Sequence, residues 1–329
     1  MKAVEWKSEK LRGSSQGPVT PRKDSSSILT VLHDFISYLR DERQASPLTL
    51  DSYERDLLRF INAVPEKNQL SEITPEDIRA HMQHLLGRKL SKATVRRAMH
   101  AMGSFLGWAT RWRLIDANPS LQVLIPRRER LREVRALSKR ERSVLIAAAD
   151  KLVQTSTHKN DQQGPLLVRL MLKTGFRRSE VIGLSWGDIN MEQGEILVRY
   201  GKGGKSRRVP LEDADLLTRL KQLRAQLHVD DIGNELLLTK SVFTGATGKR
   251  LTPSTFYKIF HRILAAAELK GTGITPHSLR HTFGSVLCQR GVPVPYVKDL
   301  LGHKDIGSTM IYVHSTPSEL RNAVKKLRE

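Results

Sequence analysis

The sequence has little cysteine and no long apolar stretch. Its 329 residues include a single cysteine, Cys288, which excludes an internal disulfide and any zinc site built from several cysteines. We expect Cys288 to be a small buried hydrophobic residue. No apolar run is long enough to span a bilayer, and residues 1–27 lack the apolar centre of a signal peptide. The sequence therefore predicts a soluble, cytoplasmic protein.

Acidic residues are also in deficit. The chain has 55 Lys and Arg against 34 Asp and Glu, a formal net charge of +21. Such a charge indicates a polyanion as partner, with nucleic acid as the first candidate and a membrane surface as the second. The sequence lacks the Gly-x-x-x-x-Gly-Lys-Ser/Thr phosphate-binding loop and has no carboxylate cluster with metal-ligand spacing. We therefore expect neither a metal nor a nucleotide cofactor.

The length allows two domains, each with a core of its own. Residues 1–26 mix Lys, Arg, Ser, Gly and Pro without a period, which indicates a flexible basic arm or simply a disordered tail. We expect a helical domain over residues 27–116, a linker over 117–136 and a second domain over 137–329.

Apolar residues recur at helical spacing four times in the expected first domain. The first helix begins at Ile28 and the second spans residues 49–63. Thr74 followed by Pro75 predicts the capped start of a third helix. The fourth spans residues 91–112, which makes a four-helix domain.

Basic residues lie on or beside this fourth helix and continue into the expected linker. Such a set suits a surface that follows a phosphate backbone, although a solvated charged face and an idle hinge are the plain alternatives. The candidate DNA-binding residues are Lys89, Lys92, Arg96, Arg97, Arg111, Arg127 and Arg128.

The second domain opens with helices and then turns to strands. Arg177 lies at the turn into a short helix, where a surface pair with Glu180 is its ordinary interpretation. Residues 195–200 and 207–211 alternate as strands do, and the glycines between them predict a hairpin turn. Lys202 stands in this turn, either as a solvated lysine or as a functional one.

The last part of the chain carries a set of groups suited to attack on a phosphodiester. His277 and Arg280 are three residues apart, so they share one face of a helix that begins near Pro276. His303 follows at the end of a second helix and Tyr312 within a third. The set supplies positive charge, hydrogen-bond donors and one oxygen nucleophile.

These residues resemble the signature of the tyrosine recombinases, the site-specific recombinase and integrase family. The similarity lies in His-x-x-Arg, then Leu-Gly-His, then a tyrosine nine residues after that histidine. Residues 174–180 (Thr-Gly-Phe-Arg-Arg-Ser-Glu) and the glycine-rich turn at 201–205 are similar to two further family segments. Departures at Phe176 and Met310 leave every reacting group in place.

The resemblance implies a mainly α fold with a small β-sheet. A four-helix, SAM-like core-binding domain and a mixed α/β catalytic domain would form a C-shaped clamp around double-stranded DNA. The enzyme would act as a homotetramer on two paired sites, in integration, excision or dimer resolution. The helix after Tyr312 would dock in a neighbouring protomer, although folding back on its own domain is the plain alternative.

The resemblance also implies roles for single residues. Arg177 and Arg280 would clamp the scissile phosphate and His303 would donate a third hydrogen bond. Tyr312 would attack, forming a 3′-phosphotyrosine, while His277 accepts its proton. The sixth residue, Lys202, would protonate the leaving 5′-oxygen.

Two other functions fit the same residues. A type IB topoisomerase would use this set as a monomer, and a regulator without catalysis would only bind DNA. The sequence leaves open whether Tyr312 acts in its own protomer's site, and whether a second recombinase or an accessory DNA-bending protein takes part.

Overall fold

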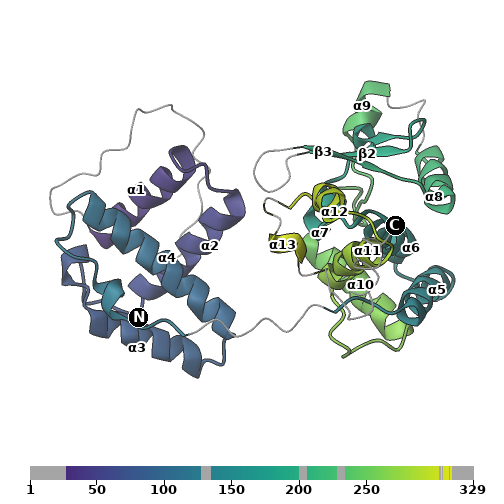
Figure 1. The fold of residues 1–329 in the computed structure, drawn as a ribbon. Coiled ribbons are helices and arrows are strands. Elements are labelled where there is room, and N and C mark those ends of the chain that lie inside the picture. Colours follow the sequence, from purple (N-terminus) through teal and green to yellow (C-terminus); the bar gives the residue numbers. More distant parts are fainter. Residues whose placement is uncertain are drawn as a thin grey trace, which may run out of the picture. The chain divides into compact units, whose positions relative to one another are not determined.

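The computed structural model describes residues 27–126, 135–199, 206–227 and 234–303, together with 305, 307–310 and 312. The predicted arm, Arg127, Arg128, the turn with Lys202 and the helix after Tyr312 lie outside the described residues. The chain divides into two compact units, Met1–Leu131 and Arg132–Glu329 (Figure 1). No helix within the described ranges combines the length and apolar character needed to cross a membrane.

Unit 1 contains the four predicted helices, which confirms the mainly helical N-terminal part. The second helix begins two residues earlier than expected, because Ser46 caps it and Pro47 occupies its first position. Thr74 and Asp77 form the capping box of the third, as its sequence indicates. The helices are α1 (Ile28–Asp41), α2 (Pro47–Ile61), α3 (Pro75–Gly87) and α4 (Lys92–Arg111), with short 3₁₀ turns η1 (Leu70–Glu72) and η2 (Pro119–Gln122).

The core of unit 1 is built around aromatic rings from α1 and α4. The ring centroid of Phe35 lies 5.2 Å from that of Phe105 and 5.4 Å from that of Trp108. Residues after α4 also pack on this unit: Val123 is buried, and Arg79 donates to the Gln122 carbonyl at 3.1 Å. The beginning of the segment expected as a linker is thus held against unit 1.

Unit 2 is organised around α6, which is buried along almost its whole length and packs against α5, α8, α10 and α11. Its helices are α5 (Lys139–Thr155), α6 (Gly164–Thr174), α7 (Arg178–Gly183), α8 (Ala214–Ala225), α9 (Asn234–Thr239), α10 (Pro253–Ala266), α11 (Pro276–Gln289), α12 (Val294–Leu301) and α13 (Gly307–Met310), with 3₁₀ turns η3 (Lys159–Gln163) and η4 (Trp186–Asp188). The prediction that Tyr312 lies within a helix is wrong for the described chain, because α13 ends at Met310.

A small antiparallel sheet lies at one side of unit 2, in the order β1-β2-β3. The two predicted strands are present as β2 (Glu195–Val198) and β3 (Arg207–Pro210), with Val198 opposite Arg207. The sequence pattern missed β1 (Ile189–Asn190), since two residues are too few to show alternation. Strand β3 packs against α12, which brings the sheet to the helices of the C-terminal part.

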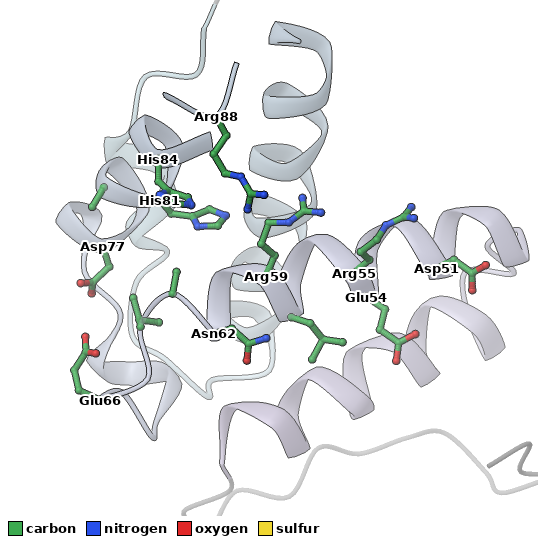
Figure 2. Close-up of a pocket in the computed structure, with 14 residues that line it drawn as sticks. Asp51, Glu54, Arg55, Arg59, Asn62, Glu66, Asp77, His81, His84 and Arg88 are labelled. Carbon is green, nitrogen blue, oxygen red and sulfur yellow. The ribbon is translucent and has the colours of Figure 1, made fainter. Parts of the chain in front are cut away.

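A cavity of about 1130 Å³ opens between α2 and α3 in unit 1, and Figure 2 shows its lining. Three arginines line it, Arg55, Arg59 and Arg88, but so do four carboxylates, Asp51, Glu54, Glu66 and Asp77. These opposite charges leave no positive surplus for a phosphate chain.

His81 is the unusual group in this lining. It is 3% exposed, stands edge-on to the Phe60 ring, and neither of its ring nitrogens has a hydrogen-bond partner. Burial, followed by the charges of His84 and Arg59, lowers the His81 pKa from its ordinary 6.5 to about 4. The folded state therefore holds this imidazole neutral and unpaired, which costs stability.

His81 makes the stability of unit 1 depend on pH between 6.5 and 4. Below 6.5 the unfolded chain protonates this imidazole and the folded chain does not, so the free energy of unfolding falls as pH falls. From the shift, we expect a loss of about 2 kcal/mol at pH 5. His81→Leu should remove this loss, as measured by thermal unfolding at pH 7 and pH 5.

The exposed His33→Leu, on α1, is the matched control and should keep the wild-type dependence. Equal pH dependence in wild type and His81→Leu would contradict the assignment.

Candidate active site

The C-terminal end of α12 holds three arginines from three different elements. Arg207 in β3 donates from Nε to the Leu300 carbonyl at 2.9 Å. Arg280 in α11 donates from Nη2 to the Leu301 carbonyl at 2.6 Å, and Arg177, just before α7, donates from Nη2 to the Gly302 carbonyl at 3.0 Å. Helix-terminal carbonyls lack partners inside the helix and carry partial negative charge. This end of α12 therefore attracts guanidinium groups.

One buried carboxylate, Glu180 in α7, joins the same arginines. Arg177 donates to it from the backbone N–H at 2.8 Å and from Nη1 at 2.7 Å. Arg207 binds both carboxylate oxygens, at 3.1 and 2.9 Å, and Arg280 Nη1 lies 4.0 Å away. Burial acts to raise the Glu180 pKa, but the hydrogen bonds and charges of Arg207 and Arg177 hold it below its ordinary value. The carboxylate is thus ionised at neutral pH.

The cluster keeps a surplus of positive charge. Burial, and then the charge of Arg177, lowers the Arg280 pKa to about 10, so this guanidinium is still protonated at neutral pH. Among the groups described above, three guanidinium charges meet the single carboxylate charge of Glu180. Such a surplus in a site of low hydration favours an anion with several oxygens, such as a phosphate.

Two histidines stand beside these arginines, and both are neutral at pH 7. The His303 pKa is lowered from 6.5 to about 4, first by burial and then by the charges of Arg280 and Arg177. His277 lies at the start of α11, where loss of hydration and the same two charges lower its pKa. His303 Nδ1 lies 2.8 Å from the hydroxyl oxygen of Thr309. When Nδ1 accepts that hydroxyl proton, Nε2 carries the ring N–H and can donate it.

Tyr312 lies in an apolar recess of unit 2 and is 3% exposed. Its ring stands edge-on to His281 at a centroid distance of 4.7 Å and is stacked with His303 at 6.0 Å. A Cβ at Gly284 would come within 3.1 Å of this ring, so the absence of a side chain there lets the ring lie against α11. Burial raises the Tyr312 pKa, while the charges of Arg280 and Arg177 act to lower it.

Five of the six predicted catalytic residues thus gather around the end of α12: Arg177, His277, Arg280, His303 and Tyr312. The sixth, Lys202, lies outside the described residues. Arg177 makes the pair with Glu180 that is its ordinary interpretation, and it also donates to the Gly302 carbonyl. Sequence reasoning missed Arg207 and Thr309. The partners of Arg207 lie 27 and 93 residues away, and the six-residue spacing between His303 and Thr309 matches no regular helix or strand contact.

The predicted DNA-binding residues of unit 1 fall into two groups. Arg97 binds both oxygens of the fully buried Asp56 carboxylate at 2.8 and 3.0 Å, and Arg96 donates to the Pro126 carbonyl. These two hold unit 1 together. The side chain of Arg97 is nevertheless 42% exposed, and Lys89, Lys92 and Arg111 are exposed too. Lys92 and Arg111 mark opposite ends of α4, about 28 Å apart at 1.5 Å per residue.

Comparison with known proteins gives matches in both units. Residues 135–319 match the phage integrase family, and residues 32–112 match the phage integrase N-terminal SAM-like domain. Tyrosine recombinase XerC of Pelotomaculum thermopropionicum is 30% identical over 90% of this chain and 96% of its own length. Tyrosine recombinase XerD of Oceanobacillus iheyensis is 29% identical over 88% and 95%.

A solved structure also has a similar fold. The Tn1549 transposon integrase in complex with circular intermediate DNA superposes with a TM-score of 0.69 at 18% identity, over 91% of this chain and 99% of that one. At 18% identity, this similarity shows a shared fold and nothing more.

The contact between His303 and Thr309 yields a prediction. Thr309→Val keeps the shape of this buried side chain but removes the hydroxyl, so Nδ1 loses the partner that selects the ring tautomer. In nitrogen NMR spectra of the histidines, we expect the His303 ring to change from one tautomer to a mixture. Thr309→Ser, which keeps the hydroxyl, is the control. An unchanged His303 spectrum in Thr309→Val would disprove this role.

Proposed function

Because the chain belongs to the phage integrase family of tyrosine recombinases, it is a site-specific DNA recombinase, and we propose that the cluster at the end of α12 performs its strand transfer. The observation that carries the proposal is the meeting of Arg177, Arg280 and His303 beside Tyr312. Their chemistry matches a phosphodiester, whose non-bridging oxygens gain negative charge in the transition state.

The clamp would consist of Arg177 and Arg280. Each guanidinium presents a rigid fork of N–H donors that suits two phosphate oxygens. Each donates to a carbonyl at the end of α12, which holds the two guanidinium groups at the same place in unit 2. Neutral His303 would add one N–H from Nε2 to the same phosphate.

The reaction begins with attack of the Tyr312 oxygen on the scissile phosphorus. The new phosphorus–oxygen bond joins the tyrosine to the 3′-phosphate, and the bond to the 5′-oxygen breaks. His277, with its lowered pKa, takes the phenol proton, and Lys202, placed by family resemblance, gives a proton to the 5′-oxygen. One phosphate ester replaces another, so a 5′-hydroxyl from a second strand can reverse the step without an energy source.

The described arrangement represents a resting state. Arg280 is 1% exposed and Tyr312 3% exposed, so neither can reach a DNA phosphate without rearrangement. A buried tyrosine with a raised pKa is also a poor nucleophile. We infer that binding of DNA opens this part of unit 2 and brings the Tyr312 hydroxyl to the clamp.

The other features of the function follow from this assignment. Residues 27–116 would be the core-binding domain and 137–329 the catalytic domain. Lys89, Lys92 and Arg111 would contact double-stranded DNA from unit 1, with Arg127 and Arg128 adding contacts beyond the described residues. We propose that two paired sites are joined by a homotetramer in the cytoplasm, with the C-terminal helix docked in trans.

Covalent capture tests the central step. The purified protein is incubated in EDTA, without nucleotide, with labelled DNA from the flanks of its own gene, including nicked fragments that trap cleavage. Wild type should form a denaturation-resistant protein–DNA adduct, and Tyr312→Phe should form none, because it lacks the attacking oxygen. Tight binding without an adduct, on these and other candidate DNAs, would favour the regulator without catalysis.

The two groups of basic residues in unit 1 should behave differently. If Lys89 and Arg111 each neutralise one phosphate, Lys89→Gln and Arg111→Gln should each reduce the slope of log affinity against log salt by about 1. Arg97→Gln should instead lower the free energy of unfolding by about 1 kcal/mol, because the buried Asp56 loses two hydrogen bonds and keeps the one from Arg59. Unchanged slopes for both exposed residues would remove them from the interface.

A further inference from the structure

Arg207 has an unusual position for a strand arginine beside a glycine-rich turn. Its side chain is 12% exposed, whereas that of Arg208, the next residue in β3, is 64% exposed. Alternation along the strand directs one side chain inward and the other outward. A charged group is rarely buried unless it is paired, so the partners of Arg207 indicate what it does.

All three nitrogens of the Arg207 guanidinium are used. Nη1 and Nη2 bind the two oxygens of Glu180, and Nε binds the Leu300 carbonyl. The face of the group lies over the Phe176 ring, 5.7 Å from its centroid. Each guanidinium nitrogen thus has a protein partner, and the side chain is 12% exposed, so we assign Arg207 to holding these partners in place.

The first group that it fixes is the support of Arg177. The Glu180 carboxylate bound by Arg207 also accepts the Arg177 backbone N–H and its Nη1. With two arginines on one carboxylate, the orientation of each depends on the other. Loss of the Arg207 fork would let the carboxylate rotate and take Arg177 with it.

The second group is the turn that leads to His303. Gly302 has φ +65, and a Cβ built there would lie 2.8 Å from Arg207 Nη1. The guanidinium therefore rests directly on the backbone of this turn, which only a glycine at 302 permits. Through this contact and the Leu300 carbonyl, Arg207 holds the residue immediately before His303.

We propose that Arg207 is a positioning residue of the strand-transfer reaction, which sets Arg177 through Glu180 and His303 through the end of α12. This inference rests on the proposed function. Arg207 touches neither DNA nor the reacting atoms in this assignment. It acts by keeping Arg177 and His303, the two phosphate-binding groups, in the correct relative positions.

Lysine is not an adequate substitute under this proposal. An ammonium group keeps the charge near Glu180 but cannot bind both carboxylate oxygens and a carbonyl in one plane. Arg207→Lys is thus the informative variant, since it separates geometry from charge. Arg208→Lys, one residue away on the exposed side of β3, is the matched control.

The test compares single-turnover adduct formation on two nicked substrates. One has the ordinary scissile phosphate, and the other has a methylphosphonate there, in which an uncharged methyl group replaces one oxygen. DNA affinity and the thermal midpoint are measured on the same proteins. Under this proposal, Arg207 places Arg177 and His303 where they can stabilise the negative charge of the phosphate. The rate of adduct formation should therefore depend less on Arg207 when the scissile phosphate carries less charge.

On ordinary DNA, we expect Arg207→Lys to form the adduct about 10- to 100-fold more slowly than wild type, as for loss of one transition-state donor. On methylphosphonate DNA the deficit should shrink to about 3-fold or less, because the charge to be stabilised is smaller. Its DNA affinity should stay at the wild-type value, and Arg208→Lys should match wild type throughout.

Three results would overturn the inference: a normal rate in Arg207→Lys, an equal deficit on both substrates, or an equal effect in Arg208→Lys. If Arg207→Lys does not fold, Arg207→Gln, which keeps a planar donor, takes its place in the same comparison. Absence of an adduct with wild type would refute the proposed function itself, and this outcome is distinct from any result with the variants.

Discussion

The fixed end of α12 is the constraint on which the catalytic cluster depends. Three consecutive carbonyls, of Leu300, Leu301 and Gly302, each accept a hydrogen bond from a different arginine. These arginines come from β3, α11 and the start of α7, which are far apart in sequence. Like charges at such close quarters repel, so they can share one place only because helix carbonyls and Glu180 offset the repulsion. The remaining positive charge is what a phosphate can use.

Electrostatics also explain why both histidines are neutral. Burial is the largest cause of both lowered pKa values, and the charges of Arg280 and Arg177 add to it by making a further proton unfavourable. Neutral histidines suit the proposed chemistry, because one can accept a proton and the other can donate an N–H. At Tyr312 burial raises the pKa, and the same arginine charges act in the opposite direction because they favour the phenolate. Burial and the same two arginines, Arg177 and Arg280, thus act together on the protonation of three neighbouring groups.

Local signals made much of this structure predictable from sequence. The Thr74–Pro75 start of α3 depends on residues within one helical turn. Recognition of family motifs supplied Arg177, Arg280 and His303. The role of Arg207 could not be predicted, because its partners Glu180 and Leu300 lie 27 and 93 residues away. The sequence also offers many other acidic residues with which it could have paired. The burial of Tyr312 likewise depends on packing between helices that no spacing rule specifies.

The recess beside Gly284 has a consequence for how fast the nucleophile becomes available. The ring of Tyr312 rests there through contacts with His281, His303 and the bare backbone of α11. Each of these contacts is weak, and none of them is a hydrogen bond or an ion pair that would have to be broken as the ring moves outward. Substitutions in the apolar wall of this recess would therefore raise or lower the stability of the buried position of Tyr312 by small amounts.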